Sequence, residues 1–119
     1  MLEAMWAVYF VNETNSKFGA GIIVLENGLI RGGDSSYYYL GNYRVKDDIF
    51  YAEVDVNHYF GQKNNISGPY DKVKVTLTGR YAYETFTLHG ESIPIVNGQP
   101  VGLNQPTSIA LERIAEITR

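Results

Sequence analysis

The sequence predicts an all-β protein that folds as a small antiparallel up-and-down barrel of about eight strands. Apolar runs rich in β-branched and aromatic residues recur at short intervals, and clusters of turn residues separate them. The pair Asn27-Gly28, with apolar residues on both sides, is typical of the two-residue turn of a type I′ hairpin. Residues 49–59 alternate between apolar and polar side chains, which indicates a half-buried strand.

The first half of the chain is expected to form four strands joined by short turns. The corner Gly32-Gly33-Asp34 lacks side chains where the chain must bend sharply or where another backbone comes close. The run Gly19-Ala20-Gly21 lies inside a β-pattern with no helix after it, so it predicts close packing by a neighbouring strand rather than a phosphate loop. The expected strands are residues 5–11, 18–25, 29–33 and 37–45.

The second half begins with the most regular strand, residues 49–59, whose apolar face is expected to point into the barrel. Residues 60–70 are rich in Gly and Asn and are expected to form a long loop. Residues 72–78 and 85–89 also alternate, and we expect them to pair as a hairpin around residues 79–83. In the strand over residues 49–59, the apolar face is expected to hold Phe50, Ala52, Val54 and Val56. Glu53 and Asp55 are expected on the opposite face, in water.

The C-terminal part of the chain combines a segment rich in turn residues with a regular apolar segment. Residues 91–106 are rich in Gly, Pro and Asn and are expected to be irregular, reaching across one barrel end. In residues 108–119, Leu111, Ile114 and Ala115 suit a helical stripe, whereas Ile109 and Leu111 suit an alternating strand. We interpret the segment as a strand, because a closed barrel needs a last strand to cover the open edge of the first.

Length and composition favour a single domain that spans residues 5–119. The chain has 119 residues, of which 45% are hydrophobic, enough for one core. Its net charge of −3 provides no basic field for direct binding of nucleic acid. No apolar stretch approaches the ~20 residues needed to span a bilayer, and no export signal is visible, so we expect a cytoplasmic protein without membrane contact.

The sequence contains no pattern that indicates catalysis, a metal or a cofactor. Cysteine is absent, and His58 and His89 stand alone, without a second His or a Cys at ligand spacing. There is no Gly-x-Ser-x-Gly elbow for a serine nucleophile. We therefore expect a protein that is not an enzyme.

The run Tyr37-Tyr38-Tyr39, followed by Tyr43, places aromatic rings on both faces of one strand. We expect Tyr38 and its same-face neighbours to fill the core. Tyr37, Tyr39 and Tyr43 then occupy the opposite face, either as an ordinary surface or as the anchors of a protein interface, since Tyr buries much area at little entropic cost.

Residues 18–45, FGAGIIVLENGLIRGGDSSYYYLGNYRV, resemble the first half of the GrlR-like family of small bacterial regulators. The shared pattern is a Gly-spaced strand, an Asn-Gly turn, Gly-Gly-Asp, aromatic residues and a Gly before the next strand. The resemblance implies a lipocalin-like barrel and a negative regulator of transcription, of the kind that represses type III secretion genes. It also implies action by contact with a protein partner such as a transcriptional activator.

In that family an acidic loop between the fourth and fifth strands is tied to regulatory binding. The matching place here reads Val45-Lys46-Asp47-Asp48, so the resemblance implies that Asp47 and Asp48 bind the partner. Considered alone, a Lys-Asp-Asp hairpin loop is also common turn chemistry, because Asp supports loop hydrogen bonds and tolerates the left-handed conformation. Both interpretations stay open at this point.

Two functions from different classes follow from the sequence. The first is the non-enzymatic regulator, and its exposed Tyr-rich strand and weak charge favour a symmetric homodimer. The alternative is a carrier that binds a small apolar ligand in the barrel cavity. Large inward side chains along several strands favour a filled interior, so a cavity in the barrel would separate the two interpretations.

Overall fold

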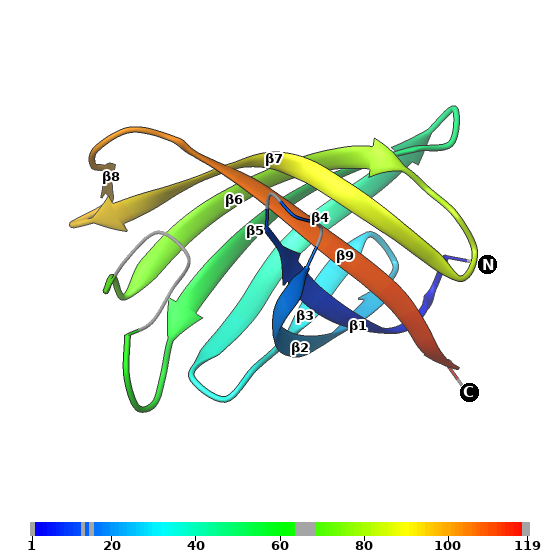
Figure 1. Ribbon diagram of the computed structural model, residues 1–119, viewed down its shortest axis with the longest axis horizontal. Coiled ribbons are helices and arrows are strands. Elements are labelled where there is room, and N and C mark those ends of the chain that lie inside the picture. The colour runs from blue at the N-terminus through cyan, green and yellow to red at the C-terminus, as the bar shows by residue number, and fades with distance from the viewer. Residues whose placement is uncertain (1, 13, 15, 64–68, 118–119) are drawn as a thin grey trace.

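The last long strand of the chain closes the sheet onto the first (Figure 1). The computed structural model describes residues 2–12, 14, 16–63 and 69–117. The strands are β1 (Ala4–Val11), β2 (Lys17–Glu26), β3 (Leu29–Gly33), β4 (Tyr37–Lys46), β5 (Ile49–His58), β6 (Lys72–Arg80), β7 (Thr85–Val96), β8 (Gln99–Pro100) and β9 (Gln105–Glu116).

Strands that follow one another along the chain lie side by side and run antiparallel from β1 to β7. The strand β9 pairs with β1 on one side and β7 on the other, so these eight strands form a closed up-and-down barrel. The two-residue β8 pairs with β7 outside the ring. The predicted all-β fold and strand number are confirmed, as is the interpretation of the C-terminal segment as a strand, up to Glu116.

The expectation of an irregular segment over residues 91–106 is wrong. Strand β7 continues to Val96, turns back through Asn97-Gly98 into β8, and β9 starts at Gln105. Asn97 and Gly98 have φ of 53° and 77°, the same values as Asn27 and Gly28, so both pairs form type I′ turns. The sequence signal for this second hairpin was therefore present among the prolines and glycines.

The alternation in β5 is confirmed. Phe50 and Ala52 are buried, and Val54 and Val56 are half-buried against the same core. Glu53 is exposed on the outer wall, and the carboxylate of Asp55 lies 3.7 Å from the ammonium group of Lys72 at the surface. The predicted loop over residues 60–70 follows β5, and its central residues 64–68 lie outside the described residues.

Aromatic rings fill the end of the barrel where both chain termini lie (Figure 1). The ring centroids of Trp6 and Phe86 are 5.2 Å apart, and Phe86 packs against Phe50 at 5.5 Å. Tyr43 stacks on Phe50 at 5.3 Å, and the guanidinium of Arg113 lies 4.8 Å from the Trp6 ring. Such aromatic pairs contribute stability beyond the effect of the area they bury. Their rings fill this end of the interior.

Replacing Phe50 with Ala should lower the free energy of unfolding by about 3–5 kcal/mol, because the lost ring contacts leave a cavity in the core. Phe60→Ala is the matched control: Phe60 is 70% exposed, and its loss should change stability by no more than about 0.5 kcal/mol. Chemical denaturation of both variants measures this. Equal losses would show that the assigned interior face of β5 is wrong.

Candidate functional site

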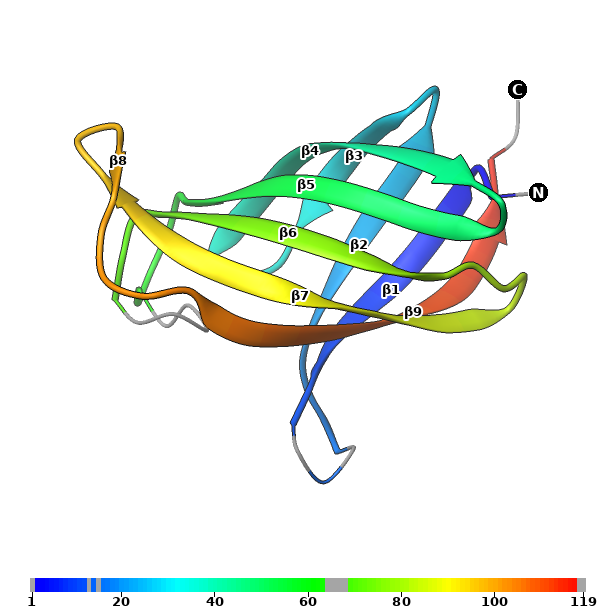
Figure 2. The same ribbon diagram turned by 90° about the horizontal axis from the view of Figure 1, so that it is seen from above.

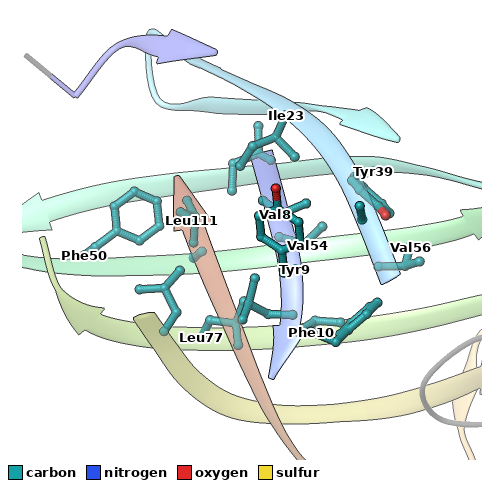
Figure 3. Close-up of a pocket in the computed structure, with 17 residues that line it drawn as sticks. Val8, Tyr9, Phe10, Ile23, Tyr39, Phe50, Val54, Val56, Leu77 and Leu111 are labelled. Atoms are coloured by element: carbon teal, nitrogen blue, oxygen red, sulfur yellow. The ribbon is translucent and has the colours of Figure 1, made fainter. Parts of the chain in front are cut away.

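The interior of the barrel contains an apolar cavity of about 80 Å³ (Figure 3). Among the described residues that line it, only Tyr9 and Tyr39 have a polar side-chain atom. A charged group placed here would lose its water without gaining a partner, so the cavity suits an apolar occupant. The lining residues are Val8, Tyr9, Phe10, Ala20, Gly21, Ile23, Ile30, Tyr39, Phe50, Ala52, Val54, Val56, Val75, Leu77, Leu88, Ile109 and Leu111.

Side chains alternate between the inner and outer face along each strand, and the inward ones line this cavity, as the two-residue period of the sequence predicts. Small residues keep part of the space unfilled. Ala52 lies on the wall between larger neighbours, and Gly21 lets the Tyr39 ring lie across β2. A Cβ atom at Gly21 would lie 2.8 Å from the Tyr39 hydroxyl, too close for any larger residue without a shift.

The cavity reaches the surface beside the first half of β2. Ala20 lines the cavity and is exposed, as are the neighbouring residues Lys17, Phe18 and Gly19. Gly19 has φ +66°, and the pairing of β1 with β2 shifts register at this level, which is a β-bulge. Figure 2 shows this part of the β1–β2 hairpin extending away from the body of the barrel. In Figure 3, Phe10, Tyr39 and Val56 lie at one end of the cavity and Phe50 at the other.

Asp34 holds the chain beside this opening. Its Oδ1 accepts hydrogen bonds from the backbone N–H groups of Ser36 and Tyr37, at 2.9 and 2.8 Å. Its Oδ2 accepts a hydrogen bond of 2.5 Å from the Tyr39 hydroxyl, and its carbonyl accepts one of 2.6 Å from the Tyr59 hydroxyl. The carboxylate therefore fixes both the corner between β3 and β4 and the position of the Tyr39 ring.

The expectation that Tyr37, Tyr39 and Tyr43 form the outer face of β4 is wrong. Tyr37 and Tyr39 are buried and Tyr43 is half-buried, whereas Tyr38 is 41% exposed. The reason is register: Tyr39 pairs with Val56 and Tyr43 with Ala52, and directly paired residues share a face of the sheet. These three rings belong to the interior, so they cannot anchor an interface from the outer wall.

Asp47 and Asp48 are exposed and form the whole turn between β4 and β5. Both have positive φ, 53° and 65°, as a type I′ turn requires. The carbonyl of Asp48 accepts a hydrogen bond of 2.8 Å from the Tyr81 N–H. Lys46 precedes the turn and Arg80 lies opposite Ile49, so two basic residues offset the two acids. The turn lies at the barrel end that holds the termini, away from the cavity opening.

The parts of the site that the sequence analysis missed are Asp34, the aromatic pair Phe10 and Phe18, and the role of Ala20. Phe10 stacks on Phe18 with ring centroids 5.7 Å apart, on the hairpin that borders the opening. The Gly19-Ala20-Gly21 run signalled the close approach that Tyr39 makes to Gly21. Nothing in the sequence indicated that this approach borders a cavity.

Within the described part of the chain, no three His, Asp or Glu side chains gather closely enough to hold a metal ion. The same residues include no helix with the length and apolar character needed to cross a membrane. The chain matches no protein-family model, and no curated protein matches its sequence. The cavity, its opening and the exposed acidic turn are the features from which a function can be inferred.

The hydrogen bond between Tyr39 and Asp34 should make stability depend on pH in the alkaline range. Burial raises the pKa of Tyr39, and the bond to Asp34 raises it further. The unfolded chain therefore loses this proton at lower pH than the folded chain, so the residue's contribution is present below pH 10 and is lost as pH rises above it.

Tyr39→Phe should lower the free energy of unfolding by about 1.5–3 kcal/mol at neutral pH, the usual worth of a hydrogen bond to a charged group. The difference between parent and variant should shrink above pH 10, because only the parent has this proton to lose. Denaturant titrations on both sides of that pH measure it. A difference that stays constant would contradict the buried, hydrogen-bonded hydroxyl.

Proposed function

We propose that this chain is a non-enzymatic binding protein whose barrel takes up a small apolar group. The observation that carries the proposal is the apolar cavity that reaches the surface beside β2. Among the described lining residues there is no carboxylate, imidazole or amine, and of the two hydroxyl groups, on Tyr9 and Tyr39, that of Tyr39 already donates its proton to Asp34. Such walls can bind an apolar group by removing it from water, and they hold no group placed to transform it.

The size of the cavity restricts the occupant. Its 80 Å³ is smaller than the engineered protein cavity of about 150 Å³ that takes up benzene. A branched aliphatic group of a few carbon atoms suits this volume, and a lipid acyl chain exceeds it. Eight-stranded barrels with fewer large inward side chains can hold a larger ligand. The ligand proposed here is smaller, because side chains fill most of the interior.

Xenon is a suitable probe, because it is apolar, small and enters dry cavities. Under xenon pressure, the methyl resonances of the cavity residues Val54, Val75 and Leu88 should shift with saturation. Ala52→Leu should abolish these shifts by filling the space, whereas Ala115→Leu, on the exposed end of β9, should leave them unchanged. Methyl shifts in the parent that do not saturate would overturn the proposal.

The second candidate is the regulator that the GrlR-like resemblance implies, acting through Asp47 and Asp48 on a basic protein partner such as a transcriptional activator. One observation favours it. The chain uses Asn-Gly at two type I′ turns but keeps two acids at this one, although positive φ costs a residue with a side chain more than it costs glycine. Residues that are kept at an exposed position although they lower the stability of the fold are typical of binding sites.

Replacing Asp47-Asp48 with Asn-Gly removes both charges and improves the turn, so a loss of binding could not come from misfolding. The double variant should gain about 1 kcal/mol of stability. It should also retain less of the protein that the parent captures from native cell extract, most clearly at low salt. The reverse exchange, Asp-Asp in place of Asn27-Gly28, should lose a similar amount of stability without affecting capture. Unchanged capture by the Asn-Gly variant would leave the acids as ordinary turn residues.

A homodimer belongs to the regulator proposal, and its support now comes from different residues than the sequence suggested. Ile22, Gly33 and Tyr38 are aligned in register across β2, β3 and β4, so Ile22 and Tyr38 flank a glycine on the outer wall. Ile22, Tyr38 and Leu40 are each more than two-fifths exposed. Sedimentation of the parent and of Tyr38→Glu tests this surface, since a charge at its centre should dissociate the dimer.

A further inference from the structure

We propose that the unpaired edge of β2 over residues 17–21 is a docking site for an extended segment of a partner protein. The segment adds to the sheet as a short strand and inserts one apolar side chain into the barrel cavity. This inference rests on the proposed function, because it assigns the apolar group to a peptide side chain rather than to a free small molecule.

The ladder of hydrogen bonds between β2 and β3 covers only half of β2. Strand β2 has ten residues, but its pairing with β3 runs only from Ile22 to Glu26. Lys17, Phe18 and Gly21 pair with β1 on one side, and no described residue pairs with residues 17–21 on the other. An unpaired strand edge presents backbone N–H and C=O groups that another strand can satisfy.

The cavity opens at this same edge. Ala20 and Gly21 belong both to the unpaired segment and to the cavity wall. Ala20 is exposed, whereas Gly21 is buried beside the Tyr39 ring, so the accessible part of this edge is residues 17–20. In a strand added here, successive side chains would point to opposite faces, so one of them would point toward the cavity.

The size and chemistry of the cavity identify the occupant as a peptide. A volume of 80 Å³ suits a single aliphatic side chain better than a lipid tail, and a lipid surface has no row of alternating N–H and C=O groups to pair with the edge. A second copy fits less well. If residues 17–21 of two copies paired antiparallel about Gly19, Phe18 of one copy would lie opposite Ala20 of the other, and a Phe ring is too large for a cavity of 80 Å³.

The bulge at Gly19 limits how this edge can be used. A bulge twists and bends the strand, so the edge is not a long flat template for unlimited pairing. The pairing is therefore confined to a few residues, and the inserted side chain has to supply the specificity.

The probes are blocked peptides of sequence Thr-Thr-X-Thr-Thr, in which X is Ala, Val, Leu, Phe or Asp. Each is titrated into the isotope-labelled full chain while the amide resonances of residues 17–21 are followed. We expect saturable shifts confined to this edge and its surroundings. The best aliphatic peptide should bind about tenfold or more tightly than the Asp peptide, the ratio that burial of one aliphatic side chain supplies.

Ala52→Leu should remove the preference for Val or Leu over Ala at position X, because the added side chain occupies the cavity. Ala115→Leu should keep that preference. If Ala52→Leu does not fold, Val56→Phe fills the end of the cavity nearer the opening and replaces it.

The inference is overturned if none of the apolar peptides shifts the amides of residues 17–21, or if the Leu and Asp peptides bind equally. Shifts at this edge that arise from protein concentration alone, or from phosphatidylcholine vesicles, would assign it to a second copy or to a membrane and would also overturn it. Saturable xenon uptake without peptide pairing overturns this inference and leaves the proposed function standing. Without xenon uptake in the parent, the proposed function itself fails.

Discussion

The rest of the structure depends on the position of β9, which pairs with β1 along one edge and with β7 along the other. Each strand of a sheet has backbone N–H and C=O groups along both of its edges, and these groups need hydrogen-bond partners. Closure of the barrel gives the two outermost strands partners within the same molecule. Closure also separates an inner from an outer face for every strand. The packed aromatic end and the apolar cavity both follow from that separation.

The opening of the barrel comes from a mismatch in strand lengths. Strand β3 has only five residues, because the chain turns at Asp34, whereas β1 and β2 continue as a hairpin for several residues more. The corner is stable because the Asp34 carboxylate accepts hydrogen bonds from two backbone N–H groups and from Tyr39. The short strand therefore leaves its neighbour without a partner where the interior is least filled.

The barrel ends differ in chemistry, and the two candidate functions lie at opposite ends. The end with the termini is filled by Trp6, Phe50 and Phe86, and it carries the exposed acids of the turn between β4 and β5. The other end carries the cavity opening and the unpaired edge of β2. The two sites share no residues.

Local patterns determined the strands and the first hairpin: the Asn27-Gly28 turn and the alternation in β5 both act within a few residues. Tyr43 was expected on the outer face of its strand, although two local patterns together imply that it points inward. A two-residue turn at Asp47-Asp48 pairs Tyr43 with Ala52, so an inward Ala52 requires an inward Tyr43. The pair Asn97-Gly98 is a local turn signal of the same kind, although the segment was expected to be irregular. Only the tertiary structure decided the cavity, the Tyr39 bond to Asp34 and the free edge of β2, because these depend on where strands of unequal length end once the barrel has closed.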